Sequence, residues 1–354
     1  MSIMARDFKE IKDLFRKIKQ LPKLDDRFCI IFVYNTPATM RDSFHTTECV
    51  FSEEQDMIIS SFKHIAEVVY SIDGEDQFIE KINIIKQKHE FVMVYSMAQN
   101  ITGNGRRSLI PLLCEYYGFI NIGADFMSCA LGRSKDLMYY LLKDTFTFPQ
   151  TFYIKKGDSI EGILPAISSG KWLLKPNNES SSIGIEIHVF NEISFSEICS
   201  ILDDYRKKHP TFCIQEFIEG DEVAVPILKI QDYFYCPGIS QVAFPTGINH
   251  ISYDMIALGT YGYFEYEGPL RDSLISIAAG VSKQLGLSSM SRIDFRIRNN
   301  IAYIEDIGAN PTISQGNGVN QIYCHHLDAK PWCIYAILAY SALMNYGLFE
   351  PTLH

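Results

Sequence analysis

The chain has 354 residues, of which 47% are hydrophobic and 21% charged, a balance typical of a folded enzyme and not of a disordered protein. Its formal net charge of -10 argues against a nucleic-acid partner, because contact with a phosphate backbone needs a basic surface. Nine cysteines without a CxxC pair exclude a disulfide framework and a structural zinc site on spacing. Free thiols in that number suggest a reducing compartment, so we expect a cytoplasmic protein.

Apolar residues mark both ends of the chain. The N-terminal ones form a helical stripe of Phe8, Ile11, Phe15, Ile18 and Leu21. Packing of this stripe on the body of the protein is favoured over a membrane surface. Residues 332–349 are nearly all apolar, but polar residues interrupt them and no basic cluster flanks them. We expect a helix buried in the core or in a subunit interface, and no membrane partner.

The first third of the chain alternates strand and helix patterns. Buried-strand runs occupy 27–34 and 91–95, and helical spacing occupies 53–69 and 107–117. This alternation predicts an α/β fold that begins with a parallel sheet, whose carboxyl edge binds ligands.

The remaining two thirds mix helices with strands that look antiparallel beyond residue 220. Helices are predicted at 135–143, 159–167 and 270–285, and strands at 151–154, 171–175, 185–189, 223–228, 233–235, 291–297 and 301–306. We expect three lobes: 1–120, 121–214 and 215–354.

The sharpest motif is LKPNNESSSIGI at 174–185, in which a strand delivers Lys175 to a loop of small polar residues. The loop contains Ser180, Ser181 and Ser182. Small residues expose backbone N–H groups that can cradle anionic oxygens, and the lysine adds a point charge. An ordinary solvated hairpin loop explains this segment alone equally well.

Two acidic segments favour the functional interpretation. Arg292 and Asp294 lie two apart on one predicted strand, and therefore on one face of it. Glu305, Asp306 and Asn310 end the next strand. Carboxylates and an amide at paired strands form an oxygen-rich site suited to Mg²⁺, which also binds substrate phosphates. A surface hairpin with solvated acids is the alternative, but it explains less well why acids interrupt apolar runs.

A short connector separates two further strands, and an adenine could lie against its backbone groups. The connector is Glu216, Phe217 and Ile218, and Gln215, in the strand before it, is counted with them as nucleotide-binding. Glu222, at the start of the outgoing strand, is positioned to bind ribose hydroxyls.

The order and spacing of these segments, over about residues 90 to 320, resemble the D-alanine–D-alanine ligase-like branch of the ATP-grasp superfamily. The resemblance implies an ATP-grasp fold with an N-terminal parallel α/β lobe, a central lobe and a C-terminal lobe, with ATP between the last two. Lys135 and Lys175 then correspond to the two phosphate lysines, and the serines to the loop that closes over the phosphates. Asp294 and Asp306 correspond to metal carboxylates, with Glu305 or Asn310 as substitutes.

The resemblance also implies the reaction: an ATP- and Mg²⁺-dependent ligase joins a small-molecule carboxylate to an amine, both expected to be amino acids, through an acyl phosphate. Arg292, Ser182 and Lys175 would be catalytic. A homodimer is expected. The metal positions depart from the family pattern at Asp306 and Gly308, which leaves an alternative: a catalytically impaired relative that binds a nucleotide or metabolite, or serves as a partner subunit.

Overall fold

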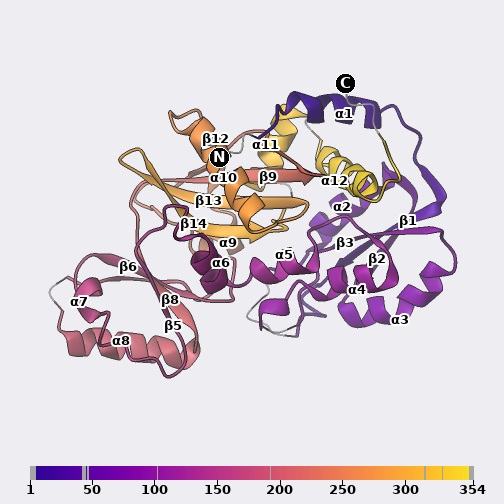
Figure 1. Cartoon of the computed structure of the whole chain (residues 1–354). Coiled ribbons are helices and arrows are strands. Elements are labelled where there is room, and N and C mark those ends of the chain that lie inside the picture. Colours follow the sequence, from indigo (N-terminus) through magenta and orange to yellow (C-terminus); the bar gives the residue numbers. More distant parts are fainter. Residues whose placement is uncertain are drawn as a thin grey trace.

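The computed structural model describes residues 5–41, 45, 48–101, 103–191, 193–314, 316–328 and 330–350. The strands of this part of the chain form three sheets, each covered by helices (Figure 1). The predicted α/β class is confirmed.

The N-terminal sheet has the strand order β2-β1-β3-β4, and every pairing in it is parallel. Its strands are β1 (Leu24–Tyr34), β2 (Ala66–Asp73), β3 (Phe91–Ser96) and β4 (Ile120–Asn121). Alternate side chains of β1 enter different cores: Ile30 and Phe32 pack with α2 (Ser52–Lys63), while Cys29 and Ile31 pack with α3 (Glu75–Lys86) and α4 (Leu109–Tyr117). Helices on both faces explain why β1 is a continuous apolar run.

The helix predicted over 53–69 is too long. It ends as α2 at Lys63, and the chain turns into β2 at Ala66, which pairs with β1. The apolar residues of 65–69 fit either period, and the β-branched Val68 and Val69 favour the strand once β1 offers hydrogen-bond partners. Helix α3 was not predicted.

The two ends of the chain pack together on this lobe. Helix α1 (Lys9–Ile18) buries Ile11, Leu14, Phe15 and Ile18, whereas Leu21 is 40% exposed and lies off the predicted stripe. Helix α12 (Trp332–Asn345) is buried from Cys333 to Met344, between α1 and α2 (Figure 1). The predicted buried terminal helix is therefore confirmed. Among the described residues, no helix has both the length and the apolar character that crossing a membrane requires.

The second sheet is antiparallel, in the order β5-β8-β6-β7. It consists of β5 (Thr151–Ile154), β8 (Phe212–Glu216), β6 (Lys171–Pro176) and β7 (Glu186–Val189). Helix α8 (Phe195–Lys208) packs Ile198, Leu202 and Tyr205 against it and begins at a capping box on Ser194. The helix predicted over 159–167 forms only its last turn, α7 (Leu164–Ile167), because Gly162 and Pro165 disfavour an earlier start.

The third sheet is antiparallel and has six strands in the order β12-β11-β9-β13-β14, with β10 beside β9. The strands are β9 (Asp221–Ile230), β10 (Tyr233–Tyr235), β11 (Ser240–Ala243), β12 (Gly262–Glu265), β13 (Met290–Arg298) and β14 (Ile301–Ala309). Helices α10 (Arg271–Gln284) and α6 (Lys135–Leu142) share its core.

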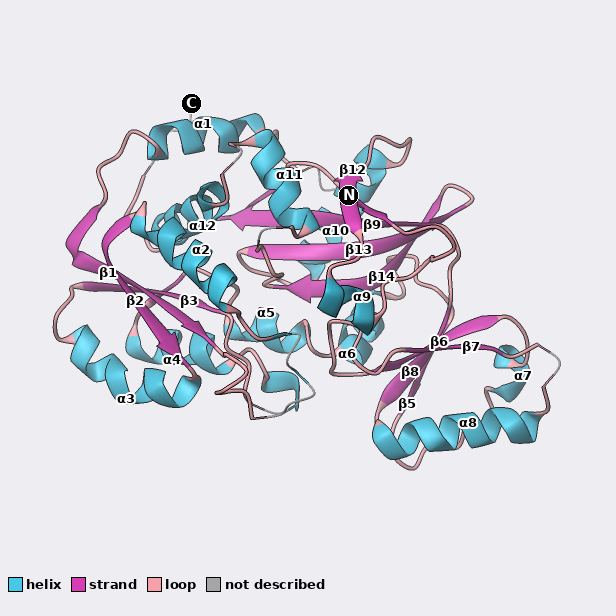
Figure 2. Cartoon of the chain, turned by 180° about the vertical axis from the view of Figure 1, so that it is seen from behind, coloured by secondary structure: helices cyan, strands magenta, loops and turns pink. Residues whose placement is uncertain are grey.

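Shorter helices complete the chain: η2 (Gly103–Gly105), α5 (Phe126–Leu131), α9 (Tyr253–Leu258) and α11 (Gly318–His326). Figure 2 shows the second sheet and α8 set apart from the N-terminal sheet, with the third sheet between and above them. The division into lobes at 120 and 214 stays a prediction.

Candidate active site

A cavity of about 510 Å³ is lined by residues from all three lobes. Glu48 and Glu54 come from the N-terminal lobe, Lys175 from β6, Glu222 from β9, and Asp294 from β13. The cavity therefore lies where the three parts of the chain meet.

Lys175 is a buried cation in the wall of this cavity. Its side chain is 5% exposed, and its Nζ lies 3.3 Å from Glu305 Oε1. Burial opposes the charged form, but the carboxylates of Glu305 and Asp306 outweigh it and raise the pKa of Lys175. Glu305 also accepts from Arg296 Nε at 2.9 Å. Lys175 is therefore a fixed positive charge, held against one wall of the cavity.

A β-bulge explains why two consecutive acids face the cavity. In the β13–β14 pairing Asp294 lies opposite Asp306, and Phe295 lies opposite Ile304, so Glu305 has no partner in the ladder. The extra residue shifts the side-chain alternation. Both Glu305 and Asp306 consequently line the cavity, together with Asp294.

Arg292 and Asp294 face the cavity as an ion pair, with Nε–Oδ1 and Nη2–Oδ2 distances of 2.8 and 2.7 Å. Burial is the main influence on Asp294 and, with the neighbouring Asp306 and Glu305, raises its pKa to about 6 against the opposing effect of Arg292. The carboxylates thus exceed what the local cations neutralise. Such an oxygen-rich, electronegative wall fits a hard divalent cation such as Mg²⁺.

The serine loop between β6 and β7 has an unusual backbone. Ser181 and Ser182 have φ values of 54° and 55°, a left-handed conformation that costs energy in residues other than glycine. Gly184, with φ 72°, has no room for a Cβ, which would lie 2.7 Å from Pro176 Cγ. Among the described residues, the N–H groups of Ser181 and Ser182 donate to no protein acceptor. These amides are free to bind anionic oxygens.

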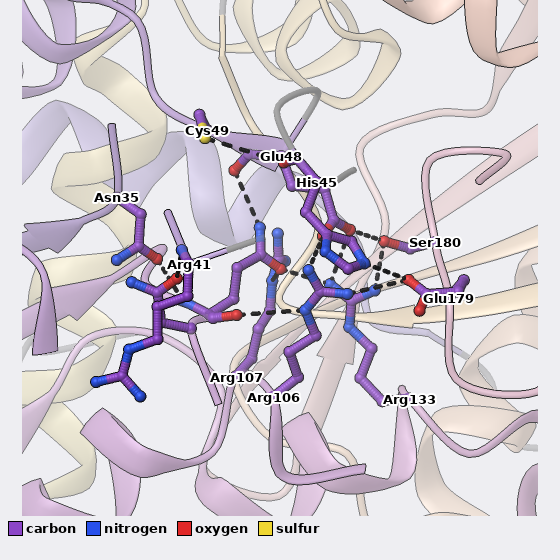
Figure 3. Close-up of polar contacts among 12 residues, drawn as sticks. Asn35, Arg41, His45, Glu48, Cys49, Arg106, Arg107, Arg133, Glu179 and Ser180 are labelled. Carbon is purple, nitrogen blue, oxygen red and sulfur yellow. Dashed lines mark hydrogen bonds and ion pairs between the residues drawn. The ribbon is translucent and has the colours of Figure 1, made fainter. Parts of the chain in front are cut away.

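Contacts with other lobes hold this loop over the cavity (Figure 3). Glu179 Oε2 lies 3.0 Å from Arg106 Nη1 and 2.9 Å from His45 Nε2. Lys135 donates to the Glu179 carbonyl oxygen, and Ser180 donates to Glu48. On the far side, Ser182 Oγ donates to the Ile251 carbonyl at 3.0 Å. The loop is thus bound to the N-terminal lobe and to the C-terminal lobe at once.

The connector after β8 contributes one aromatic ring to the cavity. Phe217 lines it, with Lys171 Nζ 4.0 Å from the centre of the ring. The backbone N–H of Phe217 already donates to the Lys171 carbonyl, and that of Glu216 to the Gln150 carbonyl. Glu222 also lines the cavity and pairs with Arg296. Burial, and then Glu305, raise the pKa of Glu222 to about 8.

Most of the predicted site residues are brought together. The cavity wall contains Lys135, Lys175, Ser180, Ser181, Ser182, Phe217, Glu222, Arg292, Asp294, Glu305 and Asp306. Four predicted residues lie outside it: Gln215, Glu216, Ile218 and Asn310. Gln215 donates to Thr151 Oγ1, Glu216 pairs with Arg298, and Asn310 donates to the Ser96 carbonyl. The binding roles of all these residues stay predictions.

Sequence reasoning missed a polar cluster on the N-terminal side of the cavity. Glu48 has a side chain only 1% exposed and pairs with Arg106 at 3.0 Å and Arg133 at 3.1 Å. Arg107 lies beside them in the cavity wall. The adjacent arginines at the start of an otherwise apolar helix are the one sequence signal that could have pointed here.

Glu48 should make the protein sensitive to acid. Burial opposes ionisation, but Arg133, Arg106 and Arg107 prevail and lower its pKa to about 2, from an ordinary 4.5. The carboxylate therefore stabilises the fold fully above pH 4.5, and this stabilisation, about 3 kcal/mol, is lost as the pH falls toward 2. In Glu48→Gln we expect unfolding at neutral pH to need roughly 3–5 kcal/mol less, since two buried arginines lose their anion.

Urea unfolding between pH 7 and pH 2.5 measures this effect. The free energy of unfolding of Glu48→Gln should fall less steeply with acid than that of the unmodified protein. Glu67→Gln, at an exposed position on β2, is the matched control. Equal slopes in the protein and in Glu48→Gln would contradict the ion-pair assignment.

Three sheets with a cavity between them, covered by a loop from the second sheet, match the arrangement of ATP-grasp ligases. Residues 171–316 match the family model described as D-ala D-ala ligase C-terminus. Over 259 residues the chain is 27% identical to the D-alanine–D-alanine ligase of Flavobacterium psychrophilum, covering 69% of this chain and 74% of the relative. It is 22% identical to that of Pseudothermotoga lettingae over 278 residues, covering 73% of this chain and 82% of the relative.

Solved structures agree on the fold. The D-alanine–D-alanine ligase from Bacillus anthracis complexed with ATP superposes with a TM-score of 0.69 at 14% identity, covering 90% of this chain and 98% of that one. The enzyme from Coxiella burnetii gives 0.63 at 14% identity, covering 90% and 96%. The resemblance to the D-alanine–D-alanine ligase-like branch of the ATP-grasp superfamily, predicted from the sequence, is confirmed.

Proposed function

We propose that this protein is an ATP-dependent carboxylate–amine ligase that forms an amide through an acyl phosphate and releases ADP and phosphate. The comparisons bear out this reaction class, and nothing in them favours the impaired alternative. The observation that supports this proposal most directly is that Lys135, Lys175 and the free amides of the serine loop line the same cavity as the acids of β13 and β14.

Different residues of the cavity would bind different parts of the nucleotide and the substrates. Lys135 and Lys175 would bind the phosphates, and Glu222 and Phe217 the nucleoside. The serine loop, with Ser182, would exclude the water that hydrolyses an acyl phosphate. Arg292 would stabilise the oxyanion that forms when the amine attacks.

The proposed resident metal is Mg²⁺. Asp294 and Asp306 would hold it, with Glu305 near Lys175 as a further carboxylate. When bound, it supplies positive charge that neutralises the phosphates. The substrates would be amino acids, and a cytoplasmic homodimer is the proposed state.

The direct test is ADP release by the purified protein with ATP, Mg²⁺ and pooled D- and L-amino acids. We expect release that needs both the amino acids and the metal ion, and that stops on chelation. A protein that binds ADP but releases none from ATP with any amino-acid pair would support the impaired alternative instead.

A further inference from the structure

The arginine cluster on the N-terminal side of the cavity is not used by the proposed phosphate chemistry. Arg106 and Arg107 precede α4, and Arg133 lies between α5 and α6. Figure 3 shows all three side chains extending toward Glu48, with Glu179 and Ser180 approaching from the serine loop. Three guanidinium groups thus converge near Glu48, and those of Arg107 and Arg133 line the cavity.

Among the described residues, the carboxylates of the cluster form ion pairs with only two of these arginines. Glu48 pairs with Arg106 and Arg133, and Glu179 pairs with Arg106. Arg107 donates to neutral oxygens: Nε to Gln99 Oε1 and Nη1 to the Asn310 carbonyl, both at 3.0 Å. Within the part of the chain that the structure describes, no carboxylate forms an ion pair with Arg107. Its second terminal nitrogen, Nη2, is left without a hydrogen-bond acceptor there.

Arg107 is partly buried and lies near another guanidinium. Burial, and then repulsion from Arg133, lower the pKa of Arg107. Glu54, the other acid of this wall, is itself shielded from water, which raises its pKa, and it forms no ion pair with Arg107 among the described residues. A partly buried guanidinium that forms no ion pair gives up part of its hydration, and neutral acceptors replace that hydration only in part. An anion that enters from the cavity would restore it.

The shape of the free group selects the anion. A guanidinium presents its N–H groups in a planar fork that matches the two oxygens of a carboxylate. The side chains proposed to bind the phosphates, Lys135 and Lys175, carry ammonium groups, which offer no such fork. We propose that Arg107, supported by Arg133, binds a substrate carboxylate that does not react, so that the ligase requires a substrate with a free carboxylate beside the reacting group.

This inference rests on the proposed ligase function for the identity of the ligand, and on the Arg107 side chain in the cavity wall, unpaired within the described residues, for the site itself. Two sources could supply the carboxylate: the α-carboxylate of the amine substrate, or the side chain of an acidic carboxylate substrate. Both give the same chemistry at Arg107. The experiment below separates them.

The first measurement compares kcat/KM for ADP release in the unmodified protein and in Arg107→Gln. Acceptor amino acids are paired with their α-amides, and acidic donors with their side-chain amides, glutamate with glutamine and aspartate with asparagine. We expect Arg107→Gln to lower kcat/KM about 100-fold for the carboxylate-bearing member of one pair and to leave its amide unchanged. A loss confined to acceptors identifies the acceptor carboxylate; a loss confined to donors identifies the donor side chain.

Two further variants make the outcome decisive. Arg107→Lys keeps the positive charge but lacks the planar pair of guanidinium N–H groups. This variant should therefore retain the preference for the carboxylate, with a KM about tenfold higher. Arg41→Gln removes an exposed arginine of the same lobe, paired with Asp76 outside the cavity, and should change nothing. Equal losses for carboxylates and amides in Arg107→Gln, or no loss at all, would overturn the proposal.

A binding measurement separates this site from the ligase function. Calorimetry with glutarate, D-glutamate and L-glutamate, in the presence of ADP and Mg²⁺, needs no turnover. The unmodified protein should bind at least one of these probes about 100-fold more tightly than Arg107→Gln does. If the protein shows no turnover but keeps this difference, the ligase function fails and the carboxylate site stands. If both proteins bind the probes equally, the site fails whatever the turnover.

Discussion

Replacing Lys175 with alanine is expected to lower amino-acid-dependent ADP release on the order of 10³-fold, because a fixed charge in a buried site is worth far more than one in water. Lys175 is almost fully buried, is held by Glu305, and shares the cavity wall with the free amides of the serine loop. Its removal takes one of the two proposed phosphate lysines away. Lys135 alone would leave the phosphate oxygens only partly neutralised.

The variant should keep its fold, because Glu305 retains Arg296 as a partner at 2.9 Å. Circular dichroism and the melting temperature check this point, and calorimetry with ADP reports nucleotide binding separately from turnover. Lys207→Ala, on the exposed face of α8, serves as the control lysine. Wild-type turnover in Lys175→Ala would remove the basis for the phosphate assignment.

The position of the serine loop links the two inferences drawn for the cavity. Glu179 and Ser180 of the loop bind Arg106, Arg133 and Glu48, the groups that surround Arg107. A carboxylate bound at Arg107 would therefore lie against the inner face of the closed loop. Binding of the serine loop and the proposed recognition of the substrate would then share Arg133, so a correct substrate would stabilise the position of the loop in which water is excluded.

The spacing of apolar residues predicted helices and strands well where that spacing follows either the helical or the strand period alone. Strand β5 and helices α6 and α10 follow the predicted residues to within a residue or so. The prediction was wrong where tertiary pairing decided the outcome: residues 66–69 became part of β2 because β1 lies beside them, although their apolar spacing continued that of α2. Helix α3 was missed for the same reason, since its buried face is defined only by the sheet it covers.

The site residues also fall into those that the sequence could identify and those that it could not. Lys175 and the serines lie within one short motif, and Arg292 and Asp294 within another, so each group could be named from its own segment of the chain. Glu48 and Arg133 are 85 positions apart and meet only when the lobes close on one another. The bulge at Glu305 is equally hidden, because ordinary strand alternation would turn Glu305 away from Asp306. Asn310 follows the end of β14 but faces the N-terminal sheet, which no local pattern indicates.

Replacing Asp294 with asparagine should have the second large effect: a loss of turnover of roughly 10²–10³-fold, with a higher Mg²⁺ concentration needed for half-maximal activity. Asparagine keeps the size of the side chain and one acceptor for Arg292 but removes the negative charge. Two explanations of a loss must be separated, because Asp294 both faces the proposed metal position and holds Arg292 through two hydrogen bonds.

The dependence on magnesium separates them. If Asp294 holds the metal ion, the Mg²⁺ concentration for half-maximal activity should rise about tenfold or more, since a carboxylate ligand has been exchanged for a weaker amide. If Asp294 only orients Arg292, turnover should fall while the Mg²⁺ requirement stays at its original value. Asp272→Asn, with a side chain 98% exposed on α10, controls for a general change of charge. An unchanged Mg²⁺ requirement would therefore reassign the metal to Asp306 and Glu305, and leave Asp294 as the residue that positions Arg292.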